Sequence, residues 1–455
     1  MKVVGWSVNY RYLFLEICLI LFIFTTGFTC TRRLSKSYCS DLDKEGFFVS
    51  DKIYNAANKE FLFWLSGFTD AEGNFSIFVD RGFVRFRFKI SLHIDDIETL
   101  NTIKYHLNVG IVTSEPTRGR CSYVVNKFAD INQVIIPLFL EFPLHTSKRL
   151  DFKNFCEAIS IKNQTNQKNI SKDELAKIVL LKQKMNFKRE FFTDPNTKYT
   201  PHINPNWLIG FIEGEGTFGI KTGSALYLQI AQNNTSSECL NAIKDFFLHT
   251  LTSKYTHDNK ILPLNVVSST NAKTNIVSLV INSVDALYYY VLPYLDVSKM
   301  YTRKAIDFKL WRLALLLKIQ GHYFTPEGKK LFLEITDILN KRYSTTSTKD
   351  IDNIIKDIFC SCELVLAKGP IFNMQHYIFH ADNVRKISIA SRSENPRRVY
   401  IYIEGVMVKG SPFSSYSEAH QALGLNPSSN TCNRYIDTGK RYKNNYIFTS
   451  QPLNK

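Results

Sequence analysis

The chain has 455 residues, enough for about three domains, and its formal net charge of +16 favours a polyanionic partner. Its nine cysteines are scattered without paired CxxC motifs, so the sequence supports neither a disulfide framework nor a zinc finger. Phenylalanine, tyrosine, lysine and asparagine are frequent, a usage typical of an AT-rich gene such as those of organelle genomes.

An apolar run at residues 13–28 follows Arg11 and precedes Arg32 and Arg33. At about 16 residues it is shorter than the roughly 20 that a membrane-spanning helix needs. The run is compatible with a signal-like segment or a marginal membrane anchor, so membrane contact stays open but is not favoured. We therefore treat residues 1–57 as a leader outside the folded domains.

Two stretches of the chain repeat one another. Residues 64–77 have the sequence WLSGFTDAEGNFSI, and residues 207–220 have the sequence WLIGFIEGEGTFGI. Each copy predicts the end of a helix followed by a strand, because an apolar run without proline leads into alternating apolar and polar residues. Gly73 and Gly216 stand where a helix C-terminus favours a left-handed residue.

Small residues recur four positions apart in both copies, at Gly67 and Ala71 and again at Gly210 and Gly214. A glycine inside a helix costs about 1 kcal/mol relative to alanine, so a compensating contact is expected. Small residues at this spacing let two helix backbones approach closely. We therefore expect the two motif helices to pack against each other.

Acidic residues occupy the last helical turn of each copy, at Glu72 and Glu215, where the helix dipole disfavours a carboxylate. A divalent cation would reverse that preference, because the carboxylate and the free carbonyls attract it together. If the helices pack, both acids end at one place, and two carboxylates holding Mg²⁺ suit phosphodiester hydrolysis. A solvated acidic helix end is the alternative, which the matched spacing of the two copies disfavours.

Both stretches resemble the signature motif of the LAGLIDADG homing endonucleases. In that motif the last acid before the final glycine is catalytic, and it falls on Glu72 and Glu215, while the first acid falls on Asp70 and Glu213. The resemblance implies an α+β fold in which two pseudo-symmetric αββαββα halves form a saddle over the DNA major groove. The two motif helices would form the floor of this saddle.

The resemblance also implies a chemistry and its partners. A monomer with an internal pseudo-two-fold axis would make site-specific double-strand breaks in DNA, using Mg²⁺ or Mn²⁺. Ala71 and Gly214 would lend backbone carbonyls to the metals, and water would attack phosphorus directly. Genes of this family often lie inside introns, so residues 1–57 are also compatible with translation continuous with an upstream exon.

The segment after the first motif, residues 84–92, alternates strictly between apolar and other, mostly basic, residues. As a strand it would have an apolar face for packing and a cationic face for DNA phosphates and base edges. The cationic face carries Arg85, Arg87 and Lys89. A strand that merely faces solvent is the alternative, and the neighbouring motif favours DNA binding.

The repeat extends well beyond the motif. Three further pairs of segments correspond: 100–104 with 240–244, 146–152 with 302–308, and 172–186 with 326–340. We therefore predict two LAGLIDADG domains, over residues 58–188 and 204–343. A polar linker at residues 189–203 would join them.

The strand after the second motif contains Tyr227 and Gln229, the candidate DNA contacts of this half, and Gln232. By its phase Gln232 continues the apolar face and points toward the protein. The family often has a polar residue there, near the scissile phosphate and the attacking water. The matching residue of the first half is Leu92, which cannot do this, and the adjacent His93 lies on the other face. Equal catalysis by the two half-sites is therefore in doubt.

Two lysines, Lys148 and Lys304, occupy matching positions in the two halves, each three residues before an aspartate. The family commonly has a basic residue here that reaches the active site and stabilises phosphate charge. The resemblance implies this role for both lysines. A surface lysine in the first turn of a helix is the alternative for each.

Beyond the repeat, residues 344–395 form an unassigned connector with helical spacing over 351–359. A strand is predicted over 399–403, and a capping box at Ser415 and Glu418 opens a helix through Leu423.

A second helix, to about Ile436, would follow a turn at 424–427 and complete a helix-turn-helix over residues 396–452. This tail resembles the small DNA-binding repeats at the ends of intron-encoded nucleases. The base-reading candidates are Asn430, Asn433 and Arg434, and the phosphate candidates are Lys440 and Arg441. A packing subdomain that binds no DNA is the alternative.

Two other functions use the same scaffold. An RNA-splicing maturase would bind intron RNA, and a regulator would bind DNA without cleaving it. The presence of both motif acids favours retained cleavage. We predict a mitochondrial, organelle-encoded protein, with the chloroplast as the alternative.

Overall fold

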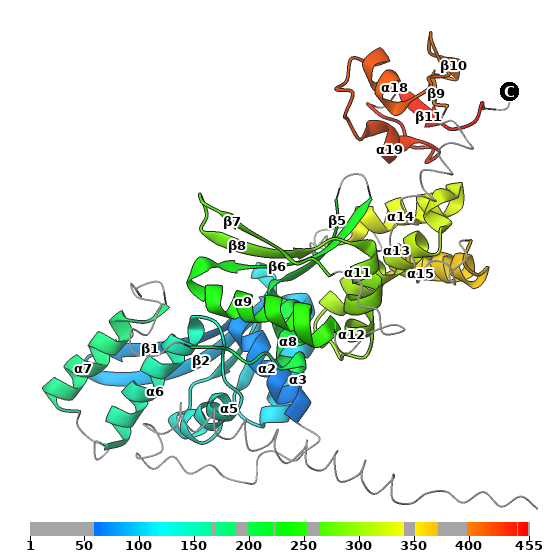
Figure 1. Ribbon diagram of the computed structural model, residues 1–455. Helices are drawn as coiled ribbons and strands as arrows, with labels where there is room; N and C mark the ends of the chain where they lie inside the picture. Colours follow the sequence, from blue (N-terminus) through cyan, green and yellow to red (C-terminus); the bar gives the residue numbers. More distant parts are fainter. Residues whose placement is uncertain are drawn as a thin grey trace, which may run out of the picture.

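The computed structural model describes residues 59–164, 170–186, 189, 199–221, 224–252, 264–340, 351–371, 398–443 and 445–453 (Figure 1). The predicted leader, including the apolar run at 13–28, lies outside these residues. Within the described ranges, no helix is long and apolar enough to cross a membrane.

The first half begins with the motif helix and contains a four-stranded antiparallel sheet in the order β1-β2-β4-β3. Its main elements are α2 (Lys59–Glu72), β1 (Gly73–Asp80), β2 (Phe83–His93), α3 (Ile97–Leu107), β3 (Ile111–Glu115), β4 (Arg120–Val125), α5 (Ile136–Glu141), α6 (Lys148–Gln164) and α7 (Lys172–Gln183).

The second half repeats this arrangement, with a sheet in the order β5-β6-β8-β7. Its main elements are α8 (Pro205–Glu215), β5 (Gly216–Lys221), β6 (Ala225–Asn233), α9 (Ser237–Asp245), β7 (Val267–Asn271), β8 (Ile276–Ile281), α12 (Leu292–Asp296), α13 (Lys304–Ile319) and α14 (Pro326–Ile338). The predicted α+β fold with two αββαββα halves is confirmed, and α7 and α14 extend it.

Alternation along the strands explains why each sheet is covered on one side only. In β2 the apolar side chains Phe86, Phe88 and Ile90 are buried, whereas the side chains between them are exposed or half-buried. The ring of Phe75 on β1 packs against Phe88 and against aromatic rings of the helices α5 and α6. Among the described residues, the helices therefore cover the apolar face and leave the opposite, cationic face uncovered.

The motif helices α2 and α8 pack at the centre of the molecule (Figure 1). A Cβ added at Gly67 would lie 1.8 Å from the Trp207 carbonyl oxygen, and one at Gly210 would lie 2.0 Å from that of Trp64. No side chain fits at such distances, so only glycine allows this approach. The predicted close packing of the two motif helices is confirmed.

The expectation that Gly73 and Gly216 adopt a left-handed conformation is wrong. Gly216 has φ −78° and ψ 150°, and Gly73 has no positive φ. Both glycines instead pack closely against the preceding helical turn. A Cβ added at Gly73 would lie 2.8 Å from the Thr69 carbonyl oxygen, and one at Gly216 would lie 2.5 Å from the Ile212 carbonyl oxygen. The chain passes directly from helix into strand, which fixes the carboxylate just before each glycine.

The C-terminal part adds one helix and a small separate module. Helix α15 (Ile351–Ala367) packs on α13 and α14 and is longer than the predicted 351–359. The module contains β9 (Tyr400–Ile403), β10 (Val406–Met407), α18 (Tyr416–Ala422), α19 (Thr431–Tyr435) and β11 (Tyr446–Thr449), with sheet order β10-β9-β11.

The module has its own core, and its two helices are joined through a buried histidine. The ring of His420 accepts the Cys432 N–H at 3.1 Å and contacts the Pro427 carbonyl at 3.2 Å. The predicted capping box is present only in part: Ser415 accepts the Glu418 N–H, but the Glu418 carboxylate accepts the N–H of Ser414 instead of that of Ser415. The two short helices and their turn are thus held in one geometry.

Candidate active site and nucleic-acid interface

The two motif acids meet at the C-terminal ends of α2 and α8. A Cβ added at Gly214 would lie 3.5 Å from the Glu72 Cγ and 2.2 Å from the Ala71 Cβ. Burial raises the pKa of Glu215, and the neighbouring charge of Glu72 raises it further. The fold therefore places two carboxylates side by side, where they repel each other and attract a cation.

The two predicted lysines reach the same helix ends from the starts of α6 and α13. Lys148 Nζ donates to the Thr69 carbonyl at 2.8 Å and to the Ala71 carbonyl at 3.4 Å. Lys304 Nζ donates to the Gly216 carbonyl at 2.6 Å. Burial lowers the pKa of Lys148, and the carboxylates of Asp70, Glu72 and Glu215 oppose that shift. Both ammonium groups are therefore hydrogen-bonded at the helix ends, unlike a solvent-facing surface lysine.

The first acid of the first motif, Asp70, is a buried anchor. Its carboxylate accepts the His145 N–H at 2.7 Å, the Thr146 N–H at 3.1 Å and the Thr146 hydroxyl at 2.6 Å. It also accepts the indole N–H of Trp207, from the other half, at 3.0 Å. These bonds fix the loop from which Lys148 extends.

Glu213 has the same role in the second half. It accepts the Tyr301 N–H at 2.8 Å, the Thr302 N–H at 2.6 Å and the Thr302 hydroxyl at 2.8 Å. The indole N–H of Trp64 completes the set. Sequence reasoning assigned no role to these acids, although the matching threonines two residues before each lysine were a usable signal.

Gln232 lies where its strand phase predicted. Its Nε2 donates to Glu215 Oε1 at 3.2 Å, and its Oε1 accepts the Asn233 N–H at 2.9 Å. Leu92 occupies the matching place on β2, and the ring of His93 pairs instead with Asp95 at 3.0 Å. A polar group therefore contacts the motif acid from this strand position in the second half.

Each lysine loop also contacts the opposite half, which no sequence signal indicated. Arg149 Nη2 lies 3.0 Å from Glu238 Oε2, and the Ser147 N–H donates to the Ser236 hydroxyl at 3.1 Å. In the other direction, the Arg303 N–H donates to Asp96 at 2.9 Å. The halves are thereby linked next to the candidate site.

The cationic face of β2 is present as predicted. Arg85 is exposed, and Arg87 and Lys89 are half-buried. The guanidinium of Arg87 lies over the Phe78 ring, 4.4 Å from its centroid, which limits its rotamers. Three positive charges thus line one strand on the face that the helices leave uncovered.

The corresponding face of the second sheet carries polar side chains. Tyr227 packs over Gly219, where an added Cβ would lie 2.1 Å from its ring. Lys221 Nζ lies 5.3 Å from the Tyr227 ring centroid. Gln229 Nε2 donates to the Ser278 hydroxyl on β8 at 3.4 Å. The two faces therefore differ in charge and in hydrogen-bonding groups.

The candidate contacts of the C-terminal module cluster around α19. Asn430, Arg434 and Arg441 are exposed, and Asn433 is half-buried. Lys440 is also exposed, but its Nζ pairs with Asp337 of α14 at 2.6 Å. Asn430 caps the start of α19, Asn433 and Arg434 lie within it, and Lys440 and Arg441 follow it in the chain.

The oxygen donors at the helix ends fit a hard divalent cation. Glu72 and Glu215 are adjacent. The carbonyl of Ala71 lies at the same helix end, where it accepts a hydrogen bond from Lys148. Carboxylates and carbonyls are the ligands that Mg²⁺ accepts. In the part of the chain that the structure describes, no cluster of three or more His, Cys, Asp or Glu is poised for a metal, so a cation here would need non-carboxylate ligands too.

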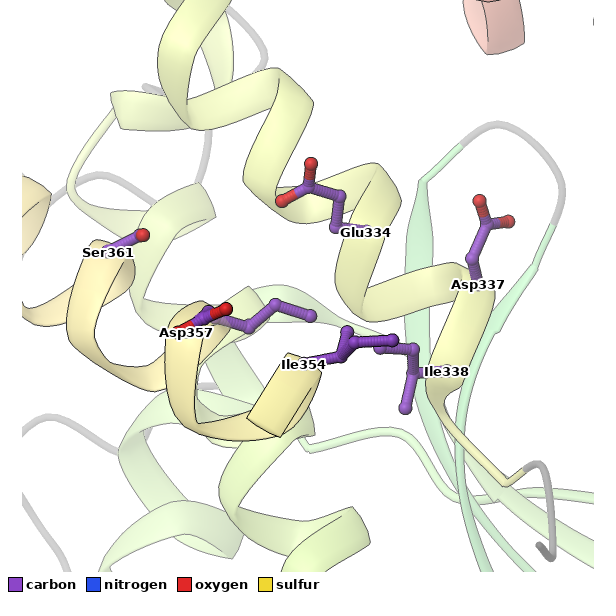
Figure 2. A pocket seen from close by; sticks show the side chains of 7 residues that line it. Glu334, Asp337, Ile338, Ile354, Asp357 and Ser361 are labelled. Carbon is purple, nitrogen blue, oxygen red and sulfur yellow. The ribbon is translucent and has the colours of Figure 1, made fainter. Parts of the chain in front are cut away.

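A separate cavity of about 320 Å³ lies between α14 and α15 (Figure 2). Its lining is acidic and aliphatic: Glu334, Asp337, Ile338, Ile354, Asp357, Ile358 and Ser361. None of the predicted site residues lines it, so this cavity is not the candidate active site.

The similarity to known proteins falls in the same two halves of the chain. The LAGLIDADG endonuclease family matches residues 65–159 and 208–315. The chain is 27% identical over 407 residues to the uncharacterized mitochondrial protein RF1 of Saccharomyces cerevisiae, covering 86% of this chain and 82% of that protein. It is 22% identical over 343 residues to probable intron-encoded endonuclease 2 of Neurospora crassa, covering 68% and 71%.

Solved structures share the fold. I-GzeII, a LAGLIDADG homing endonuclease in complex with its DNA target, is 25% identical with a TM-score of 0.52, covering 62% of this chain and 99% of that chain. I-SmaMI bound to uncleaved DNA in the presence of calcium ions is 19% identical with a TM-score of 0.52. The match covers 62% of this chain and 99% of the I-SmaMI chain.

The repeated αββαββα fold, with two acids meeting at the ends of its central helices, is similar to the fold of the LAGLIDADG homing endonuclease I-GzeII. Each half of this chain contains one of the two stretches that match the LAGLIDADG endonuclease family.

Proposed function

We propose that this protein is a site-specific homing endonuclease that makes metal-dependent double-strand breaks in DNA and so promotes the mobility of an intron. The observation that carries the proposal is the meeting of Glu72 and Glu215, with Lys148 and Lys304 at the same helix ends. Two anionic groups beside two cationic groups suit a reaction in which negative charge develops on a phosphate.

The proposed chemistry divides among a few side chains. When bound by Glu72 and Glu215 with carbonyls of Ala71 and Gly214, Mg²⁺ or Mn²⁺ supplies charge neutralisation and an activated water. Lys148 and Lys304 hold positive charge beside the phosphate, and Gln232 orients the Glu215 carboxylate.

DNA would lie against the uncovered faces of both sheets. Arg85, Arg87 and Lys89 supply phosphate and base contacts in the first half, and Tyr227 and Gln229 supply base contacts in the second. The guanidinium stacked on Phe78 supports a preset direction for Arg87. The likeness to I-GzeII, which binds its target DNA with this fold, supports a duplex as the ligand and a single chain as the active unit.

The C-terminal module would extend the DNA contact as a helix-turn-helix. Its base-reading candidates are Asn430, Asn433 and Arg434, with Lys440 and Arg441 on phosphates. Their position on α19 and just after it, with Asn430, Arg434, Lys440 and Arg441 exposed, supports this role. The proposed domain boundaries remain 58–188, 204–343 and 396–452.

A mitochondrial origin is supported by the relatives. One is a mitochondrial protein of Saccharomyces cerevisiae, and others are named probable intron-encoded endonucleases of Neurospora crassa and Schizosaccharomyces pombe. We propose that the gene lies in a fungal mitochondrial intron.

The direct test incubates the full chain with a duplex formed by joining the exons that flank its reading frame. We expect one discrete double-strand cut in Mg²⁺ and none in EDTA. Tight binding without cutting in Mg²⁺ would contradict the endonuclease and point to a regulator. Tighter binding of the intron RNA than of the DNA would point to a maturase.

A further inference from the structure

We propose that Lys162 and Lys318 are positioning residues that hold the DNA-reading ends of the two β-hairpins, and that each controls recognition of the outer base pairs in its own half of the target. The inference rests on the proposed endonuclease function and concerns how the target is recognised, not how it is cut. Both lysines act from the helical side of their sheets, so neither touches DNA.

The hairpin of each half extends beyond the third strand of its sheet. Strand β4 pairs with β2 only from Phe88 onward, so residues 83–87 pair with β1 alone among the described residues. In the second half β8 pairs with β6 only from Leu228 onward, and residues 225–227 pair with β5 alone within the same described part. An isolated pair of strands is only marginally stable, so these two-stranded ends need another support.

The proposed DNA contacts of the sheets lie largely in these two-stranded ends. Arg85 and Arg87 belong to the end of the first hairpin, and Tyr227 belongs to the end of the second. A displacement of either end would move these side chains relative to the base edges they are proposed to read. The accuracy of recognition therefore depends on what holds each end in place.

Lys162 supports the first two-stranded end from α6. Its Nζ donates to the Val84 carbonyl at 2.8 Å, where β2 has no strand other than β1 beside it in the described chain. The ammonium group lies 4.9 Å from the Phe128 ring centroid and 5.9 Å from that of Phe86. Phe86 belongs to the buried, apolar face of the sheet, so the lysine approaches from the side opposite the arginines.

Lys318 supports the second two-stranded end from α13. Its Nζ donates to the Ser224 carbonyl and, at 3.2 Å, to the Ser224 hydroxyl, and it lies 5.5 Å from the Tyr323 ring centroid. Burial lowers the pKa of Lys162 and that of Lys318, the latter to about 8, because each ammonium group has lost part of its hydration. Separating such a group from its carbonyl costs free energy, so each contact resists displacement of the hairpin end.

The two contacts are equivalent under the internal repeat. Lys162 is the fifteenth residue of α6, and Lys318 is the fifteenth residue of α13. Val84 and Ser224 each precede by six residues the strand residue that lies opposite the motif glycine. The same donor thus reaches the same backbone carbonyl in two halves whose side chains differ at that carbonyl, which indicates a shared role.

Strand geometry places the two-stranded ends over the outer base pairs of the target. Both β1 and β5 begin directly after the motif acid and run away from it. Arg85 lies opposite a residue five positions beyond Gly73, which is roughly 17 Å along the strand and about five base pairs of duplex. Tyr227 lies opposite a residue three positions beyond Gly216, roughly 10 Å or about three base pairs. The outer positions are therefore those about three or more base pairs from the motif acids.

The test measures binding of the full chain to the joined-exon duplex and to duplexes that each carry one substituted base pair. Fluorescence anisotropy in EDTA separates recognition from cleavage. A substitution at an outer position that the wild-type protein reads should weaken its binding about fivefold or more. Methionine keeps the length of the lysine side chain and removes the ammonium group. Lys162→Met should reduce this penalty to less than about twofold at the outer positions of one half of the target, and Lys318→Met should do so in the other half.

A cleavage measurement separates positioning from catalysis. At saturating protein in Mg²⁺, both variants should keep the wild-type single-turnover rate on the unaltered duplex within about twofold, because they change binding and not the reacting groups. Lys309→Met removes a charge at an exposed position of α13 and is the control, which should leave discrimination unchanged at every base pair.

A second variant tests the same contact without replacing the buried lysine. Ser224→Gly removes the hydroxyl acceptor at a residue with φ 76°, a conformation that glycine adopts without strain. It should relax discrimination in the same half of the target as Lys318→Met, by a smaller factor. Thermal unfolding verifies that each variant is folded, and Ser224→Gly decides the second half if Lys318→Met does not fold.

Unchanged discrimination in a folded Lys162→Met or Lys318→Met variant would overturn the inference. So would a loss spread equally over both halves of the target, or one confined to the base pairs beside the cleavage positions. A wild-type protein that binds the duplex specifically without cutting it overturns the proposed cleavage, and the binding measurements still decide this inference. A wild-type protein that binds the duplex no better than unrelated DNA overturns the proposed function itself.

Discussion

The indole N–H of Trp207 donates to the buried carboxylate of Asp70 across the two halves at 3.0 Å. Trp64 returns the equivalent bond to Glu213. Each half thus supplies one donor to the carboxylate that fixes the lysine loop of the other half. The interface between the halves and the geometry of the candidate site are therefore maintained by the same residues.

Removing this donor should destabilise the fold. Trp207→Phe leaves a buried carboxylate with one donor fewer, which costs about 1–3 kcal/mol beyond the loss of ring volume. The matched control is Trp311→Phe, because the buried indole N–H of Trp311 has no hydrogen-bond partner among the described residues. Chemical denaturation measures both, and equal losses in the two variants would contradict the proposed contribution of the bond.

A substitution that forces the two motif helices apart should destabilise the fold more than Trp207→Phe does. Gly210→Ala places a Cβ 2.0 Å from the Trp64 carbonyl oxygen, and the backbone must move because neither partner is a flexible side-chain end. We expect a loss of about 3 kcal/mol or more. Ala71→Gly at the same interface removes a Cβ and should lose only about 1 kcal/mol, from helix propensity. A Gly210→Ala protein as stable as Ala71→Gly would show that the helices do not pack this closely.

The doubled motif was enough to predict the packing of α2 on α8 and the meeting of Glu72 with Glu215, because both depend on residue spacing within about a dozen positions. The two αββαββα halves were predicted from the resemblance to the LAGLIDADG family. Gln232 was located by strand phase alone. Sequence pattern and tertiary structure agree at these positions because the burial of one face of each helix or strand determines both the apolar periodicity and the packing.

Other features depend on contacts that no local pattern encodes. Asp70 binds a loop that lies 75 residues further along the chain, so its anchoring role became visible only in the fold. The cross-half pair of Arg149 and Glu238 is not repeated in the second half with the same residue types. The left-handed glycine was predicted from helix-end statistics, but here the chain enters a strand at once and close packing, not φ, requires the glycine.

Stability should fall in acid because of His145. Burial lowers its pKa to about 3, and the charges of His202 and Arg149 act in the same direction. Between the ordinary histidine value of about 6.5 and pH 3, the unfolded chain binds a proton that the folded chain does not. The stability associated with neutral His145 is therefore complete above pH 6.5 and is lost as the pH falls, by about 1.4 kcal/mol per pH unit.

The test compares the pH dependence of unfolding in His145→Gln and in the wild-type protein. The variant should lose this part of the slope, although the lost bond to Tyr199 also lowers its stability at every pH. His249→Gln, at an exposed position, should keep the wild-type slope. Parallel curves for His145→Gln and wild type would refute the assignment.

The contact between the halves at Arg149 and Glu238 should be measurable as a coupling energy. Arg149 is 7% exposed and Glu238 38% exposed, so solvent screens the pair in part. We expect a double-mutant cycle with Arg149→Gln and Glu238→Gln to give about 1 kcal/mol. The exposed pair Arg312 and Asp296, within one half, should give less than about 0.5 kcal/mol. Equal couplings would remove the distinction between the two pairs.

The measurement that tests the central claim most directly is the cleavage of the joined-exon duplex by Glu72→Gln and Glu215→Gln beside the wild-type protein in Mg²⁺. Glutamine keeps the shape of each side chain and removes its charge. If the two acids form one metal-dependent site at the ends of α2 and α8, each variant binds the target but its double-strand cleavage is abolished or reduced to nicking. Full double-strand cleavage by either variant would contradict the account.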